Sequence, residues 1–296
     1  MKDKIFKTFK KYILYWAHKK YPNIRKRKYS LEYYLNNFIF ILNDVCKWDS
    51  LKITNGYNGE YHYKTIYNEY NKWCKDNIFT NAFDTFIKEN YFKISKVRQN
   101  KKLTLFIDVV KINNLYGSEY IYIDNENKKK NITPLTFISD NNGLSLAYRH
   151  IDINRKIGKR KTHVHEINNS QHTLDKIDLK VKKYVDLTLT GDKAYISNRT
   201  YNALTQTIKI ITPKRKNQKS KNTKKEKKLL SERFKIEHLN CKIKKYNRIY
   251  VRKDKKFNNY ISFTCMAFLM MYFDFIDKMD INDDIINYIE KKYDSI

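Results

Sequence analysis

The sequence lacks clustered cysteines, a long apolar run and a visible signal peptide. Its cysteines, Cys46, Cys74, Cys241 and Cys265, form no C-x-x-C pair with the spacing of a metal site, which leaves a reducing compartment as the default. The longest apolar run, residues 260–273, is shorter than the ~20 residues of a membrane span, so we interpret it as a buried helix. Residues 1–20 form a basic amphipathic stretch instead of a signal peptide, and we expect an intracellular protein, in cytoplasm or nucleus.

Acidic residues are also scarce. The chain has 31 Asp and Glu against 61 Lys and Arg, for a net charge of +30, while its hydrophobic fraction of 41% is typical of a folded protein. An AT-rich genome would explain the abundance of Lys, Asn, Ile and Tyr, but it would not deplete the acids. The charge therefore favours a nucleic-acid partner over an anionic membrane surface.

The first third of the chain has a helical pattern. Residues 29–45 place apolar side chains at intervals of three and four, and residues 63–73 place aromatic side chains on one helical face. The glycine-containing segment 54–59 separates the two. We predict a helical N-terminal DNA-binding domain over residues 1–95.

From residue 102 the pattern changes to that of strands. LTLFIDVV is a continuous apolar run that includes Asp108, SEYIYID alternates, and PLTFISD and LSLAYRH flank an Asn-Asn-Gly turn. Further strands are predicted at 186–192 and 208–212. Helices are predicted at 174–184, 197–206, 229–247 and 260–275, and the Lys-rich residues 214–228 are predicted to form a mobile basic loop.

A meander of strands followed by alternating strands and helices is the order of a ribonuclease H-like α/β fold, with a mixed sheet flanked by helices. We predict that this catalytic domain spans residues 96–275 and that residues 276–296 form a C-terminal helical tail.

Three acids occupy positions that suit catalysis in such a fold. Asp108 lies in the first strand, Asp192 directly follows a later strand, and Glu237 lies within a predicted helix. Taken singly, an acid at a strand end is usually a turn or cap residue, and a helical Glu usually belongs to a solvated face. Together they form a candidate set of ligands for two hard divalent cations, which cut phosphodiesters when about 3.5 to 4 Å apart.

Two motifs resemble a known family. GDKAYIS at 191–197 and RFKIEHLNCKIKKYNRIYVRKDKKFNNYISF at 233–263 resemble segments of the DDE transposases of the bacterial insertion-sequence "five" group, relatives of the eukaryotic Harbinger elements. KWDSLK at 47–52 and the aromatic, basic segment after it resemble that group's N-terminal helices. Ala194 stands where the family usually has Gly, and residues 150–172 contain no clear counterpart of the family's His-Asp-Ser.

The resemblance implies a DNA transposase with a ribonuclease H-like fold that acts on the inverted repeats of a mobile element. The chain would cut the element ends and join them to target DNA, using two Mg²⁺ or Mn²⁺ ions, as a dimer or larger assembly. Asp108, Asp192 and Glu237 would be the catalytic and metal-binding residues. The implied DNA contacts are Lys193, Arg233, Lys244, Arg248 and Arg252.

Two other functions remain open: a non-catalytic, domesticated DNA-binding protein, and a structure-specific nuclease that cuts without joining. His163, His165 and His172 lack the spacing of a metal site, and we favour DNA contact or solvent exposure for them. Trp48 and Trp73 are expected to be core residues rather than stacking platforms for bases.

Overall fold

The chain forms two compact units in the computed structural model, Asn90–Lys242 and the combination of Met1–Glu89 with Ile243–Ile296. We call them the sheet unit and the helical unit. The structure describes residues 3–22, 29–44, 47–51, 62–95, 102–124, 130–150, 156–157, 160–161, 166–177, 186–195, 208–215, 221–279 and 282–293. The predicted break at 54–59 and the predicted helix at 197–206 lie outside the described residues.

The sheet unit has the strand order of a ribonuclease H-like fold. Its strands are β1 (Lys102–Asn114), β2 (Tyr122–Asp124), β3 (Lys130–Ser139), β4 (Ser145–His150), β7 (Asp186–Thr190) and β8 (Lys209–Ile211). They run in the order β2-β3-β1-β7-β8, with β4 also paired to β3. β3 is antiparallel to β1, β2 and β4, whereas β7 is parallel to both β1 and β8. The predicted fold class is confirmed.

The central strand β1 is longer than its apolar pattern predicts. LTLFIDVV ends at Val110, but pairing with β3 continues to Asn113. A strand with neighbours on both sides and helices over both faces has a buried centre, and Leu105, Phe106 and Ile107 of β1 are fully buried. The predicted turn between β3 and β4 is present, and Gly143 there has φ of 69°, a backbone conformation that favours glycine.

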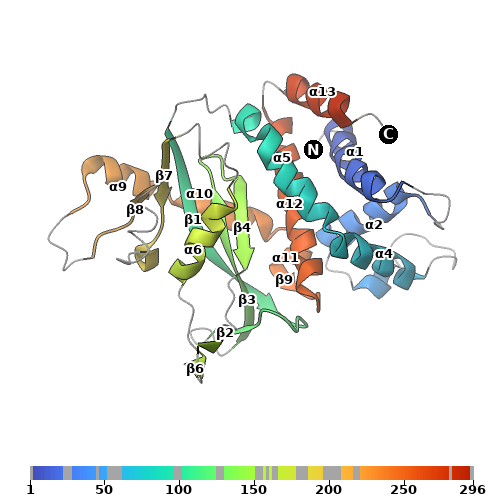
Figure 1. Ribbon diagram of the computed structural model, residues 1–296, viewed down its shortest axis with the longest axis horizontal. Coiled ribbons are helices and arrows are strands. Elements are labelled where there is room, and N and C mark those ends of the chain that lie inside the picture. Colours follow the sequence, from blue (N-terminus) through green and yellow to red (C-terminus); the bar gives the residue numbers. More distant parts are fainter. Residues whose placement is uncertain are drawn as a thin grey trace. The chain divides into compact units, whose positions relative to one another are not determined.

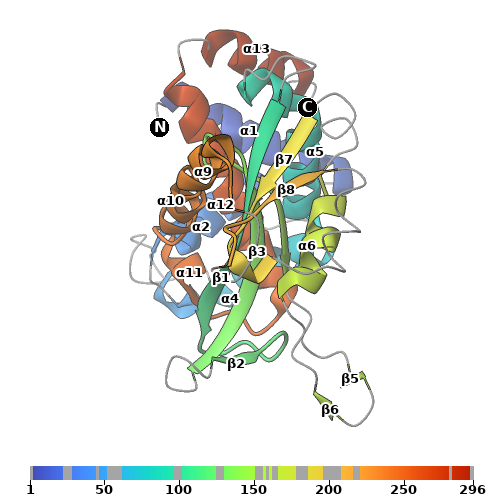
Figure 2. The same cartoon turned by 90° about the vertical axis from the view of Figure 1, so that its left-hand side faces the viewer.

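Helices cover both faces of this sheet. α6 (Glu166–Asp175) and α10 (Phe234–Ile243) lie on opposite faces in two perpendicular views (Figures 1 and 2). The predicted helix at 174–184 overlaps α6 only at residues 174–175, because α6 ends at Asp175 and a turn follows. Residues 178–184 lie outside the described part of the chain. The short strands β5 (Lys156–Ile157) and β6 (Arg160–Lys161) form a small separate hairpin.

Part of the predicted basic loop is helical. Residues 224–228 belong to α9 (Lys224–Ser231), so the prediction of a loop throughout 214–228 was wrong for this stretch. Thr223 accepts a hydrogen bond from the Glu226 amide, and the Glu226 carboxylate accepts one from the Thr223 amide. This reciprocal capping satisfies two amides at the helix start, and it stabilises a helix that buries no side chain of its own.

The predicted helix at 229–247 is interrupted twice. Turns separate α9, α10 and the short α11 (Asn247–Tyr250), which is followed by β9 (Val251–Arg252). The apolar periodicity continues across these turns, so the pattern alone did not show where the helix breaks.

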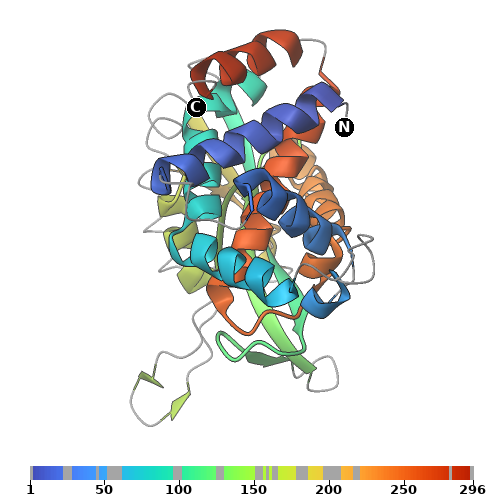
Figure 3. The same cartoon turned by 90° about the vertical axis from the view of Figure 1, so that its right-hand side faces the viewer.

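The helical unit combines both ends of the chain. Its elements are α1 (Asp3–Lys20), α2 (Leu31–Asn43), η2 (Trp48–Ser50), α4 (Tyr63–Lys75), the first part of α5 (Ile78–Ser95), α11, β9, α12 (Phe257–Asp277) and α13 (Asn282–Tyr293). Figure 3 shows the blue and cyan N-terminal helices beside the orange and red C-terminal ones. Residues 243–275, which we had assigned to the catalytic domain, and the predicted tail 276–296 therefore both group with the N-terminal helices.

Aromatic side chains fill the interior of the helical unit. Trp73 is fully buried, as expected, and the ring of Tyr70 stacks on Phe263 with centroids 4.4 Å apart. α12 is long and apolar enough to cross a membrane by length and composition, but 89% of its most apolar window is buried among the other helices. This burial agrees with the interpretation of residues 260–273 as a core helix.

A buried ion pair lies in the same interior. Nη2 of Arg248 is 2.7 Å from Oδ1 of Asp254, its Nε donates to Oδ2 at 3.0 Å, and the two side chains are 4% and 2% exposed. The Arg248 guanidinium also lies 5.8 Å from the Trp48 ring centroid. Two parallel hydrogen bonds of this kind fix both groups in place.

We predict that Asp254→Ala lowers the free energy of unfolding of the helical unit by about 3 to 5 kcal/mol, because Arg248 is left buried without its counter-ion. Asp274→Ala is the matched control, since it removes an exposed pair with Lys278 and should cost no more than about 1 kcal/mol. Urea unfolding followed by tryptophan fluorescence reports on this unit, which contains all 3 tryptophans. Equal losses in the two variants would contradict the assignment.

Candidate active site

The pairing of β1 with β7 brings two of the predicted acids to the same level of the sheet. The strands are parallel, and their last registered pair is Phe106 with Thr190. Asp108 and Asp192 each stand two residues beyond this pair. Because neighbouring strands lie about 4.8 Å apart, the two carboxylates face one small region at this edge.

Gly191 allows the chain to pass close to β1 just before Asp192. A Cβ atom at Gly191 would lie 2.8 Å from Cδ2 of Tyr195, closer than real Cβ contacts, and 3.1 Å from Cγ2 of Ile107, which is tighter than most of them. The Gly191 amide donates to the Ile211 carbonyl of β8 at 3.3 Å, which extends the sheet by one residue. Glycine in the Gly-Asp pair of the motif at 191–197 therefore allows Asp192 to lie beside Asp108.

The carboxyl group of Asp108 is half-buried and responds to its neighbours. Burial raises the pKa of Asp108 above its usual value, and the nearby Asp192 carboxylate raises it further. The guanidinium of Arg233 and the Val109 amide oppose this by stabilising the charged form. The pKa shift of Asp108 and the strand register both indicate that Asp108 and Asp192 lie close together. The effect of Arg233 on the same pKa places its guanidinium near Asp108.

Helix α10 and the turn before it supply the remaining groups. Nδ2 of Asn240 donates to Oδ2 of Asp108 at 3.0 Å, which places this helix over β1. Glu237 lies three residues before Asn240, on the same side of the helix. Its side chain is 58% exposed, and Oε1 lies 3.5 Å from Nη2 of Arg233. Asn240 therefore contacts Asp108 directly, Asp192 lies near Asp108 by register and charge, and Glu237 pairs with Arg233.

The donor set suits a hard divalent cation. Carboxylate oxygens are the ligands that Mg²⁺ and Mn²⁺ favour, and two of them converge here. Among the described residues no three His, Cys, Asp or Glu side chains gather closely enough to hold a metal ion. Glu237 lies on the helix that contacts Asp108 through Asn240, and in this structure it pairs with Arg233. Two carboxylates, with water in the remaining positions, fit Mg²⁺, which keeps several waters when it binds to a protein.

The other predicted site residues have different surroundings. Lys193 is exposed in η3 (Lys193–Tyr195), directly after Asp192, and Lys244 is half-buried in the turn after α10. Arg248 is buried against Asp254, and Arg252 is fully buried, donating to the carbonyl oxygens of Asp254 and Lys255 at 3.1 and 3.0 Å. These two guanidinium groups are buried inside the helical unit, so the prediction that Arg248 and Arg252 contact DNA was wrong.

The predicted histidines contribute no metal site among the described residues. His172 is exposed on α6, with its Nδ1 4.0 Å from Oδ2 of Asp175. His163 and His165 lie outside the described residues. Sequence reasoning missed Asn240, for which the available signal was a polar side chain one helical turn after Glu237 in a segment whose neighbours Ile236 and Leu239 are apolar.

Comparisons with known proteins give one family match and one similar solved structure. Residues 150–256, about a third of the chain, match the family model described as "Transposase DDE domain", and this segment contains Asp192 and Glu237. The fold is similar to that of a solved structure, "Cryo-EM structure of piggyBac transposase synaptic complex with hairpin DNA", with a TM-score of 0.52 at 10% sequence identity, over 98% of this chain and 80% of that chain. The family match concerns residues 150–256, and the structural similarity, at 10% identity, concerns the fold. No curated protein sequence matches this chain.

We predict that Asp108→Asn stabilises the metal-free protein at neutral pH. The folded-state pKa of Asp108 is raised, so ionised Asp108 costs stability above that pKa. The advantage of the variant should shrink as pH falls from the folded pKa to the unfolded value near 3.8, because the native wild-type side chain then binds its proton.

Thermal melts in a chelating buffer from pH 4 to 8 measure this difference. Asp284→Asn is the same exchange at an exposed position and is expected to change the melting temperature little. A variant that is less stable than wild type at pH 7 would contradict the raised pKa of Asp108.

Proposed function

We propose that this chain is a metal-dependent DNA transposase that cuts DNA at the ends of a mobile element and joins the freed ends to target DNA. The observation that carries the proposal is the convergence of Asp108 and Asp192 at the paired edge of β1 and β7, beneath the helix that bears Glu237. Within the DDE transposases, the motifs at 191–197 and 233–263 support the insertion-sequence "five" group and its Harbinger relatives.

The proposed roles of these side chains follow from their charges. Asp108 and Asp192 would hold two divalent cations, and Glu237 would move from Arg233 to complete the second site. Bound there, Mg²⁺ or Mn²⁺ supplies an activated water or 3′-hydroxyl nucleophile and stabilises the leaving oxygen. Arg233, released from Glu237, would then be free to contact a phosphate. No side chain in this set needs to form a covalent bond to DNA.

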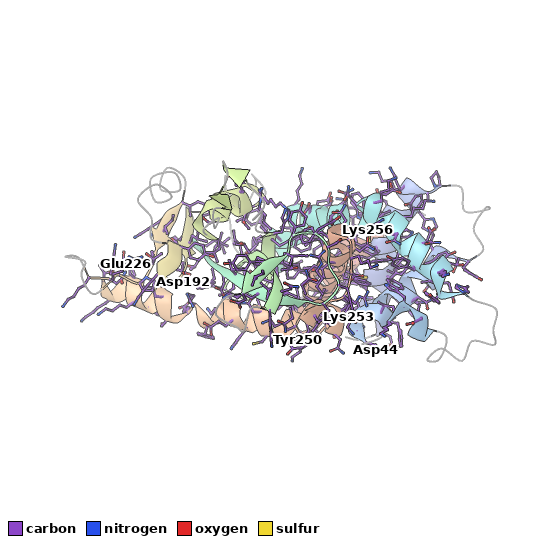
Figure 4. All side chains as sticks on the ribbon, turned by 90° about the horizontal axis from the view of Figure 1, so that it is seen from below. Asp44, Asp192, Glu226, Tyr250, Lys253 and Lys256 are labelled. Carbon is purple, nitrogen blue, oxygen red and sulfur yellow. The ribbon has the colours of Figure 1, made fainter. Side chains whose placement is uncertain are left out.

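Positive charge near the site supports DNA as the partner. The exposed residues of α9 include Lys224, Lys225, Lys227 and Lys228, and this helix leads through a short turn into α10. Figure 4 shows the side chains of α9, including Glu226, extending outward, and it places Asp192 in the same unit. Flexible lysines contact phosphates without reading sequence, so we propose α9 and Lys193 as a surface that positions DNA. Pairing two element ends would require a dimer or larger assembly.

One observation favours the non-catalytic alternative. Glu237 is 58% exposed and forms an i, i+4 pair with Arg233, as a residue of a solvated helix face would. Such a pair contributes only about 0.2 to 0.5 kcal/mol, so it is a weak reason for a Glu at this position. Experiments on Glu237 therefore discriminate between the two functions.

We predict that Asp192→Asn abolishes strand cleavage in Mg²⁺ and leaves DNA affinity largely unchanged, because the exchange removes one ligand charge at nearly constant volume. Cleavage and strand transfer are assayed on the same labelled element ends, with affinity measured in parallel. Chelation of the wild type should act in the same way. If Asp192→Asn cleaves DNA near the wild-type rate, Asp192 is not a catalytic metal ligand. If the wild-type protein cleaves the element ends but does not join them to target DNA, it is a nuclease rather than a transposase.

For Glu237→Gln we predict loss of turnover in Mn²⁺ together with a slightly raised melting temperature without metal, since one negative charge leaves a site that also holds Asp108 and Asp192. If Glu237 were only a surface residue, the variant would be less stable by a fraction of a kcal/mol and would still cut. Glu232→Gln, which breaks the neighbouring pair of Lys235 with Glu232, controls for loss of a helix-surface ion pair.

DNA binding should weaken steeply with salt, because neutralising Z phosphates releases counterions with a slope of about −0.9Z in log K against log salt. Replacing Lys224, Lys225, Lys227 and Lys228 by Gln should reduce that slope, while the same exchange at the exposed α13 residues Lys291 and Lys292 serves as the control. An affinity that barely changes between low and physiological salt would argue against a DNA partner.

A further inference from the structure

The Asn240 side chain is the described group that meets Asp108 most directly. Its Nδ2 donates to Oδ2 of Asp108 across 132 sequence positions, from the middle of α10 to the centre of β1. Its Oδ1 is buried and has no hydrogen-bond partner among the described residues. The amide group of Asn240 thus donates one hydrogen bond to Asp108, while its oxygen accepts none from the described residues.

The orientation of this amide follows from the charge of its neighbour. An ionised carboxylate only accepts hydrogen bonds, so the NH₂ group of Asn240 must face it and the amide oxygen must point elsewhere. A buried acceptor without a partner destabilises the folded state, because it has lost its hydrogen bonds to water without a replacement. A residue that served packing alone would avoid that cost, since Leu has nearly the same shape without any polar atom.

An amide also suits the charge of the site better than a further acid would. Asp108 and Asp192 already bring two negative charges to one region, and a further acid at position 240 would increase their repulsion. The neutral amide restrains the Asp108 carboxylate without adding charge. Groups that hydrogen-bond to metal ligands in this way orient them, and their loss typically weakens metal binding 10- to 100-fold.

We propose that Asn240 is a positioning residue that holds the Asp108 carboxylate in its metal-binding orientation. The proposal rests on the function proposed above for Asp108 and Asp192. Asn240 lies three residues after Glu237 on the same side of α10. This helix would therefore contribute both Glu237 as a metal ligand and the amide that orients Asp108.

The test is a Mn²⁺ titration of the full chain without DNA, followed by electron paramagnetic resonance of the free ion. Asn240→Ala should bind Mn²⁺ about tenfold more weakly than wild type. Asn240→Leu, which keeps the shape of the side chain, should show the same loss while retaining the wild-type circular dichroism. Asn247→Ala removes an amide hydrogen bond to the Asn43 carbonyl in the helical unit and should leave Mn²⁺ affinity unchanged.

Metal dependence of cleavage adds a second readout. If Asn240 positions Asp108, then Asn240→Leu should need about tenfold more Mn²⁺ for half-maximal cleavage and should regain much of the wild-type rate at saturating metal. A merely structural role would lower the rate at every Mn²⁺ concentration alike. Unchanged Mn²⁺ affinity in a folded Asn240→Leu variant would overturn the proposal.

Asp108→Asn in the same titration separates this proposal from the proposed function. If the wild type binds Mn²⁺ and Asp108→Asn weakens that binding while Asn240→Leu does not, then only the proposed role of Asn240 is rejected. Wild-type protein that binds no Mn²⁺ would reject the metal site itself, and the role of Asn240 with it.

Discussion

The parallel pairing of β1 with β7 is the constraint on which the candidate site depends. It sets Phe106 opposite Thr190, so that Asp108 and Asp192 follow at the same level although 84 positions separate them in the sequence. Parallel strands need a long crossover connection, and here α6 lies within it. Gly191 then lets the backbone come close enough to β1 for the second acid to share the site.

Bringing carboxylates together is unfavourable, and the surrounding groups offset that cost. Asp108 loses solvent and faces Asp192, and both effects raise its pKa. Arg233 and Asn240 act in the opposite direction, one by charge and one by a hydrogen bond. Both come from the α10 segment, so this helix controls the electrostatics of the site as well as carrying Glu237.

Basic residues between positions 224 and 252 have two different surroundings. The lysines of α9 are exposed on a helix that buries no side chain, as suits contact with a polyanion. Arg248 and Arg252 lie in the same stretch of sequence, but they are buried among aromatic rings and hydrogen-bonded to Asp254 and neighbouring carbonyls. Similar charge in sequence is therefore exposed to solvent in one place and buried in the other.

The sequence by itself predicted the central strands and the ribonuclease H-like class, because apolar runs such as LTLFIDVV and the Asn-Asn-Gly turn are local signals; it also proposed Asp108, Asp192 and Glu237 as candidate acids. Only the tertiary structure decided that residues 243–296 join the N-terminal helices, that Arg248 and Arg252 are buried, and that Asn240 contacts Asp108. These outcomes depend on contacts between segments far apart in the chain. Local periodicity specifies which side of a helix is apolar, but not which distant residue its polar side meets.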